Sequence, residues 1–179
     1  MNIIPEEFQD IVEKQQKKIF RYCFRMTGDF HAAQDIMQDA FVSCYGKYAG
    51  SGAIGNITGY IYKTAYHMCI DYLNGRKKAR LVELDPEMES PGMGTEESML
   101  SRYYNPKIEE CLNALTGLQR SVLILHCVDG IDYREMSGIL GKKEAALRKQ
   151  YQRAKDKIES MLKRNGGAEY EGYGVFRRV

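Results

Sequence analysis

Apolar residues recur at spacings of three and four along most of the chain, which is the period of an amphipathic α-helix. In the first half such stripes cover residues 8–23, 33–45 and 57–72, and Asp29 stands where it can cap the second of these three helices. Five glycines within residues 46–59 require a loop before the third helix. Because strand-like alternation does not persist anywhere, the pattern predicts an all-α protein.

The second half shows the same period in four shorter segments, near residues 106–115, 119–128, 132–140 and 144–162. Gly141 separates the last two segments, a short helix and a long basic one. A short helix, a glycine turn and a long basic helix form the pattern of a helix-turn-helix, whose second helix can lie in the major groove of DNA. We therefore predict a helix-turn-helix in the last two segments.

Charge divides the chain into regions of opposite character. Nine bases face three acids in residues 142–164, four more bases lie in residues 76–80, and residues 83–97 hold six acids and no base. Residues 81–104 combine this acidic run with prolines and glycines, which is typical of a flexible linker. The predicted organisation is two small helical domains, 1–80 and 105–165, joined by a flexible acidic linker, 81–104, and followed by a disordered tail, 166–179.

The residue patterns of an enzyme active site are missing from the sequence. No paired carboxylates, nucleophile with its base, phosphate-binding loop or metal motif stands out. The five cysteines are widely spaced without a C-x-x-C pair, which argues against a disulfide framework or a zinc site. The sequence also shows neither an apolar run of membrane-spanning length nor a signal peptide. We expect a cytoplasmic protein that is not an enzyme, binds no metal and needs no cofactor.

The last predicted helix carries side chains suited to reading DNA. Its outer face presents Glu144, Arg148, Lys149 and Gln152, and these residue types bond to cytosine, guanine and adenine edges. Phosphate contacts are expected from a further polar set: Lys142, Lys143, Gln150, Arg153 and Lys155. A solvated basic helix that closes a bundle is the alternative, which the turn at Gly141 disfavours.

Three segments of the second half carry a family resemblance: Leu115-Thr-Gly-Leu-Gln-Arg-Ser-Val-Leu-Ile-Leu, Val128-Asp-Gly-Ile-Asp-Tyr-Arg-Glu-Met-Ser-Gly-Ile-Leu-Gly, and Arg153-Ala154-Lys155. Together they resemble region four of sigma-70 family sigma factors, and most of all the small extracytoplasmic-function (ECF) group. The family's pattern is matched without a gap by six residues: Arg120, Glu135, Leu140, Gly141, Arg153 and Ala154.

The first half resembles region two of the same family. The matching segments are Met26-Thr-Gly-Asp-Phe-His-Ala-Ala-Gln-Asp-Ile-Met-Gln-Asp-Ala-Phe and Tyr60-Ile-Tyr-Lys-Thr-Ala-Tyr-His-Met-Cys-Ile-Asp-Tyr-Leu. Two signatures in the right order, with a linker between them, are more specific than either alone. The sequence departs from the family's usual residues at five positions: Tyr60 for Trp, His67 for Asn, Gly117 for Pro, and Lys142 and Lys143 for an apolar residue and a capping Ser or Thr.

The resemblance implies a sigma factor, which binds core RNA polymerase and directs promoter-specific transcription initiation. Core polymerase binding is then expected from Asp35, Gln38, Asp39 and Phe41. Binding of the −10 element, where unstacked bases need aromatic faces and phosphates need cations, is expected from Tyr62, Lys63, Tyr66, His67, Arg76, Lys77, Lys78 and Arg80. Binding of the −35 element is expected from Glu144, Arg148, Lys149, Gln152, Lys142, Lys143, Arg153 and Arg120.

The implied partners are core RNA polymerase, promoter DNA and, as for many ECF factors, an anti-sigma factor, without membrane insertion. Two other functions stay open. A helix-turn-helix regulator acting without core polymerase would explain the second half but not the segment 35–41. A degenerate sigma-like interaction protein would be consistent with the changes at Tyr60 and His67. Locally, Tyr62 and Tyr66 could pack against the linker or the first helix instead of facing DNA.

Overall fold

The computed structural model describes residues 6–51, 54–82 and 106–164, and all regular structure within these ranges is helical. The prediction of an all-α protein is therefore confirmed. The helices are α1 (Glu6–Thr27), α2 (Phe30–Ser51), α3 (Ile57–Val82), α5 (Pro106–Asn113), α6 (Gly117–Cys127), α7 (Tyr133–Leu140) and α8 (Glu144–Arg164). The chain forms two compact units that separate between Asn105 and Pro106.

The predicted linker and tail fall largely beyond these ranges. Only Leu81 and Val82 of the predicted linker 81–104 belong to the described residues, and they form the end of α3. The predicted tail 166–179 lies outside them altogether. Within the described part of the chain, no helix is both long and apolar enough to span a membrane.

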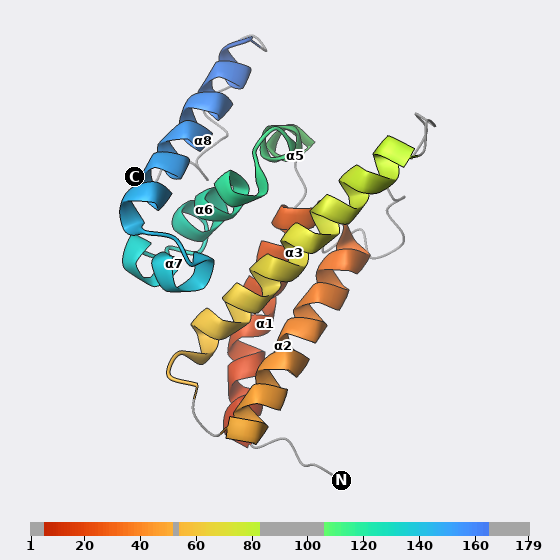
Figure 1. Ribbon diagram of the computed structural model, residues 1–179, viewed down its shortest axis with the longest axis vertical. Helices are drawn as coiled ribbons and strands as arrows, with labels where there is room; N and C mark the ends of the chain where they lie inside the picture. The colour runs from red at the N-terminus through yellow and green to blue at the C-terminus, as the bar shows by residue number, and fades with distance from the viewer. Residues whose placement is uncertain (1–5, 52–53, 83–105, 165–179) are drawn as a thin grey trace. The chain divides into compact units, whose positions relative to one another are not determined.

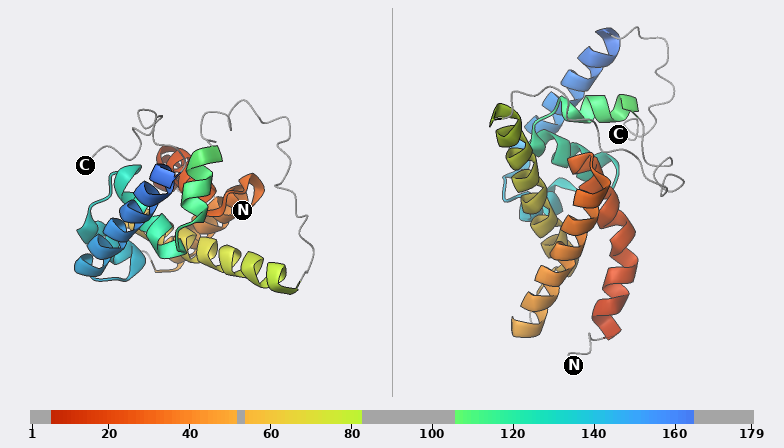
Figure 2. Two further views of the ribbon diagram at one scale, coloured as in Figure 1. Left: turned by 90° about the horizontal axis from the view of Figure 1, so that it is seen from above. Right: turned by 90° about the vertical axis from the view of Figure 1, so that its right-hand side faces the viewer.

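In the first unit, α1, α2 and α3 lie side by side along their length (Figures 1 and 2). The connection from α1 to α2 is tight because Gly28 adopts a φ of +69°, which glycine tolerates without strain. The Asp29 carboxylate accepts a hydrogen bond from the Ala32 N–H at 2.9 Å, as the sequence predicted for a cap, and another from the Tyr72 hydroxyl at 2.9 Å. Asp29 therefore caps α2 and also ties its start to α3.

The core of the first unit lies on the facing sides of these three helices. The fully covered side chains from them are Ile19, Tyr22, Cys23, Met26, Ala33, Ala40, Cys44, Ile61, Ala65 and Cys69. All five cysteines of the chain are free thiols. Burial raises the pKa of Cys44 and Cys111, so these thiols stay neutral and pack as small apolar groups.

In the second unit, α6 and α7 pack against α8 (Figure 1). α6 begins at Gly117 rather than at Gln119 as predicted, because Thr116 forms a capping box with Gln119. The Thr116 hydroxyl accepts from the Gln119 N–H, and the Gln119 side chain accepts from the Thr116 N–H, each at 3.2 Å. Gly130, with a φ of +69°, follows the end of this helix, where the sequence predicted a stop.

Candidate nucleic-acid interface

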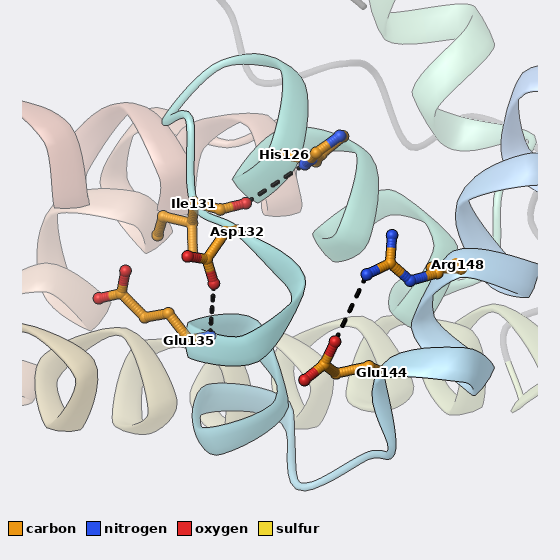
Figure 3. Close-up of polar contacts among 6 residues, drawn as sticks. All are labelled: His126, Ile131, Asp132, Glu135, Glu144 and Arg148. Atoms are coloured by element: carbon orange, nitrogen blue, oxygen red, sulfur yellow. Dashed lines mark hydrogen bonds and ion pairs between the residues drawn. The ribbon is translucent and has the colours of Figure 1, made fainter.

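The helix-turn-helix predicted from the sequence is formed by α7, Gly141 and α8. Asp132 caps α7, with its carboxylate accepting from the Glu135 N–H at 2.8 Å (Figure 3). Gly141 closes the helix in the left-handed region at a φ of +63°, and its N–H donates to the Ser137 carbonyl at 3.0 Å. A side chain at this φ would be strained, so glycine allows the chain to reverse within three residues before α8.

One face of α8 is buried and the other is open. Leu147, Tyr151, Ala154 and Ile158 lie inward at spacings of three and four. The predicted DNA-reading residues are exposed: Lys142 and Lys143 directly before α8, and Glu144, Arg148, Lys149, Gln152 and Arg153 on the helix itself. The basic face of the helix is therefore accessible along its first three turns.

Two of the residues predicted to contact phosphate are less accessible than the others. Gln150 is half-buried and its side-chain carbonyl accepts from the Gln119 amide at 3.4 Å, so it helps to join α8 to α6. Lys155 is also half-buried, and its ammonium lies 5.6 Å from the centre of the Tyr151 ring.

Arg148 is held by two neighbours although it is exposed. Its Nη2 lies 3.4 Å from a carboxylate oxygen of Glu144, one turn earlier on α8 (Figure 3). Its Cζ lies 4.4 Å from the centre of the Tyr133 ring on α7, within the range of a cation–π contact. The outer face of α8 is thus connected to the first helix of the motif.

An aromatic cluster next to this contact joins both helices of the motif to α6. The His126 ring of α6 lies 4.6 Å from the Tyr133 ring and 5.0 Å from the Tyr151 ring. His126 Nδ1 lies 3.3 Å from the Ile131 carbonyl oxygen (Figure 3). The Tyr151 hydroxyl lies 3.4 Å from the Cys127 thiol, and burial raises the pKa of both groups. These rings fix the position of α7 relative to α8.

Arg120 does not lie on the DNA-reading face, contrary to the prediction. It is only 4% exposed, its Nε donates to the Leu112 carbonyl at 2.9 Å, and its Nη2 donates to the Asn113 side-chain oxygen at 2.9 Å. The first bond adds a donor to the Leu112 carbonyl near the C-terminus of α5, which also accepts from the Leu115 N–H at 3.1 Å. Arg120 therefore joins α5 to α6 and is a structural residue.

In the first unit, Tyr62 was predicted to bind the −10 element, and this prediction is wrong. It is 2% exposed and its ring meets Tyr22 edge-on at 5.4 Å, so it belongs to the core between α1 and α3. Tyr66 is half-buried and its ring packs edge-on against His67 at 5.3 Å. Lys63 and His67 are exposed as predicted, and His67 Nδ1 lies 2.7 Å from the Lys63 carbonyl. The predicted pair of tyrosines therefore does not share one open face.

Some of the basic residues predicted to bind DNA phosphates at the end of α3 are accessible to solvent and others are not. Lys77 and Lys78 are exposed, whereas Arg76 is half-buried with its Cζ 5.8 Å from the centre of the Tyr72 ring. The side chain of Arg80 lies outside the described residues.

Three of the four residues predicted to bind polymerase lie on the exposed face of α2, and the fourth does not. Asp35, Gln38 and Asp39 are exposed, but Phe41 is 7% exposed and faces the core with Ile36 and Ala40. Phe41 is therefore a core residue.

Comparison with known proteins gives an independent view of both units. Residues 11–79 match the family described as Sigma-70 region 2, and residues 106–158 match the family described as Sigma-70, region 4. The chain belongs to the sigma-70 family. It is 25% identical to the ECF RNA polymerase sigma factor SigW of Bacillus subtilis, over 88% of this chain and 90% of that protein. It is 19% identical to the ECF sigma factor SigE of Mycolicibacterium smegmatis, over 87% of this chain but only 61% of that protein. The chain is an ECF-type member of the family.

Two solved structures share the fold of this ECF factor. One is the sigma factor RpoE in complex with the anti-sigma factor NepR from Bartonella quintana, with a TM-score of 0.64, 17% identity, and coverage of 89% of this chain and 98% of that one. The other is CnrH in complex with the cytosolic domain of CnrY, with a TM-score of 0.66, 17% identity and 89% coverage of both chains. At this identity the likeness concerns the fold.

Two surface residues of this sigma factor were not among the sequence predictions. Tyr60 is half-buried near the start of α3, and the Lys47 ammonium lies 4.7 Å from the centre of its ring. The family's usual Trp at this position was the sequence feature that could have identified Tyr60 as a functional residue. Val42 is 69% exposed and is the one large apolar side chain that is exposed among the described residues. It follows Gln38 by four residues and Asp39 by three, so it extends the polar face of α2.

Proposed function

We propose that this ECF sigma factor binds core RNA polymerase and directs promoter-specific initiation, with its second unit reading the −35 element and its first unit the −10 element. The observation that carries the proposal is the match of sigma-70 regions 2 and 4, in that order, to the two units, together with the open basic face of α8 in the second. An operator-binding regulator without polymerase would not require a region 2 unit.

In the second unit, the exposed residues of α8 supply the chemistry for reading duplex DNA. Arg148 and Lys149 can donate to guanine, Gln152 can pair with adenine, and Glu144 can accept from cytosine. Lys142, Lys143 and Arg153 are the proposed phosphate contacts. Phosphate oxygens at the start of α8 would also be attracted by the positive end of the helix.

In the first unit, the exposed side of α3 supplies the chemistry for binding a separated strand. Tyr60 and Tyr66 offer partly accessible rings, and the exposed Lys63 and His67 lie within the same two turns of the helix. Aromatic rings can stack on unpaired bases while cations bind the backbone, so this set is the proposed −10 contact. Lys77 and Lys78 follow as proposed phosphate contacts.

The proposed contact with core polymerase is the exposed face of α2: Asp35, Gln38, Asp39 and Val42. The buried centre of a protein interface is more apolar than its rim, so Val42 is the proposed centre of this contact. One of the two similar structures is a complex of a sigma factor with the anti-sigma factor NepR, which supports proposing such a partner for this chain as well. The protein would act in the cytoplasm, where polymerase and promoters are, without catalysing a reaction or needing a cofactor.

Run-off transcription with core polymerase on a library of randomised promoters tests the proposal. We expect initiation from a subset of templates that share two elements, and loss of initiation when Asp35 and Asp39 are both changed to lysine. The control is the same change at Asp10, which is exposed at the start of α1 and outside the proposed contacts. Polymerase binding without initiation on any template would indicate a degenerate sigma-like protein. DNA binding without polymerase binding would indicate an ordinary regulator.

A further inference from the structure

Arg148 is a proposed base-reading residue whose side chain contacts two neighbours, one on each helix of the motif. Its side chain is 61% exposed, yet its guanidinium lies between the Tyr133 ring, at 4.4 Å from the centroid, and the Glu144 carboxylate, at 3.4 Å. An exposed arginine otherwise samples many rotamers, and ordering it on binding opposes association. The contacts of Arg148 therefore bear on how well it reads a base.

The two contacts differ in what they allow once DNA is bound. The Tyr133 contact places the guanidinium carbon over the ring, 4.4 Å from its centroid, and uses none of the N–H groups as hydrogen-bond donors. A guanidinium stacked on an aromatic face can still donate from its edge, in plane, to a guanine. The Glu144 contact uses those same N–H groups and lies on an exposed pair one turn apart, which is the weak kind of ion pair. Only the Tyr133 contact can persist unchanged while Arg148 pairs with a base.

Tyr133 is itself well fixed. It is the first residue of α7, directly after the capping Asp132, and its ring is packed 4.6 Å from His126 and 6.3 Å from Tyr151. Burial raises the pKa of Tyr133, so the phenol stays neutral although the Arg148 charge acts in the opposite direction. The ring is thus a rigid platform held by α6 and α8.

We propose that Tyr133 is a positioning residue for −35 recognition: it orients the Arg148 guanidinium before DNA arrives and sharpens the preference for guanine at the base pair that Arg148 reads. The inference rests on the proposed function, because it takes α8 as the helix that reads the −35 element. Tyr133 acts through Arg148 and needs no contact with DNA.

A double-mutant cycle in the holoenzyme tests the coupling. Initiation would be measured on a library randomised in the −35 element for the wild type, Tyr133→Leu, Arg148→Ala, and both changes together. Tyr133→Leu is expected to reduce guanine preference at one position by roughly two- to fivefold, the range of an exposed cation–π contact. In the Arg148→Ala background the same change should have no further effect on specificity. Equal losses in both backgrounds would overturn the proposal, because they would indicate general damage to the fold.

Tyr133→Phe is the matched control, because it keeps the ring face and removes only the hydroxyl. It should retain the guanine preference, and a loss as large as that of Tyr133→Leu would overturn the cation–π explanation.

A second measurement needs no DNA and separates this inference from the proposed function. NMR relaxation of the Arg148 Nε–H in the full chain should show greater mobility in Tyr133→Leu and unchanged mobility in Tyr133→Phe. Equal mobility of Arg148 in all three proteins would overturn the inference even if the holoenzyme starts transcription from specific promoters. If Arg148 loosens as expected but the wild-type holoenzyme shows no promoter preference, the proposed function fails, and the role in −35 recognition fails with it.

Discussion

Replacing Arg120 with alanine tests whether this arginine holds the second unit together or contacts DNA. The change removes two hydrogen bonds of 2.9 Å, to the Leu112 carbonyl and the Asn113 side chain, and leaves a cavity where a 4% exposed side chain had been. Each hydrogen bond from a charged group contributes about 1.5–3 kcal/mol. Relief from burying the cation offsets part of this sum, so we expect a net loss of about 2–4 kcal/mol in the free energy of unfolding of this unit.

Amide hydrogen exchange in the full chain measures this loss where it should occur. The slowest amides of α6, from Val122 to Leu125, are buried and should exchange through unfolding of the second unit. A loss of this size corresponds to exchange that is roughly 30- to 700-fold faster. Amides of α1 to α3 belong to the other unit and should be unaffected. They provide an internal reference within the same protein.

Arg153→Ala is the matched control, since Arg153 is exposed on α8. It should leave exchange in α6 unchanged and weaken DNA binding with a salt dependence reduced by about one ion. The reasoning would be refuted if Arg120→Ala left exchange in α6 unchanged while weakening −35 binding as Arg153→Ala does.

Three further predictions follow from local features. Tyr60→Ala should impair promoter opening on duplex templates, measured by permanganate footprinting, with little change in the free energy of unfolding. Tyr62→Ala should instead destabilise the first unit by about 3–5 kcal/mol in urea unfolding, as expected for a buried aromatic residue. Gly141→Ala should lower the free energy of unfolding of the second unit by about 1–2 kcal/mol because of the φ of +63°, although an added Cβ would meet no neighbour within 4 Å. The control is Gly138→Ala inside α7, where an added Cβ also meets nothing within 4 Å and φ is not positive. It should not destabilise the unit in the same urea titration. Burial raises the pKa of Tyr151 above its ordinary value of 10.0, so the phenol stays protonated to higher pH in the folded state than in the unfolded state. The stability of the second unit should therefore be constant below about pH 10, and the part that depends on the neutral phenol should be lost as pH rises further. Measuring unfolding at a series of pH values would check this.

Periodicity and capping chemistry were sufficient to predict the helices, because both act over a few residues. The stops near Gly28, Gly130 and Gly141 follow from backbone conformations that glycine adopts most easily. The start of α6 was missed by two residues because the capping box of Thr116 and Gln119 was not recognised ahead of the apolar run.

The errors within the candidate site have a common physical origin. A spacing of four places Tyr62 and Tyr66 on neighbouring turns of one helix, but the packed helices cover Tyr62 fully and Tyr66 only in part. Phe41 belongs to the apolar stripe of α2 but was added to the polymerase contact because it is close in sequence to Asp39, and its side chain is buried in the core. Arg120 was assigned to DNA because it matches an arginine of the family's region 4 pattern, although its hydrogen bonds are internal. Each outcome depends on which side of a helix its neighbours cover, and that is decided by tertiary packing.

The residues that carry the region 4 resemblance are mostly residues that build the domain. Of the six matching positions, Arg120, Leu140 and Ala154 are buried and Gly141 closes α7 in the left-handed conformation. Each of the four has a folding role that would be the same for any promoter. The side chains that can meet base edges lie at other positions on the open face of α8: Glu144, Arg148, Lys149 and Gln152. The motif therefore identifies the family and its architecture, whereas base preference is expected to reside in these four residues and in the ring of Tyr133 that holds one of them.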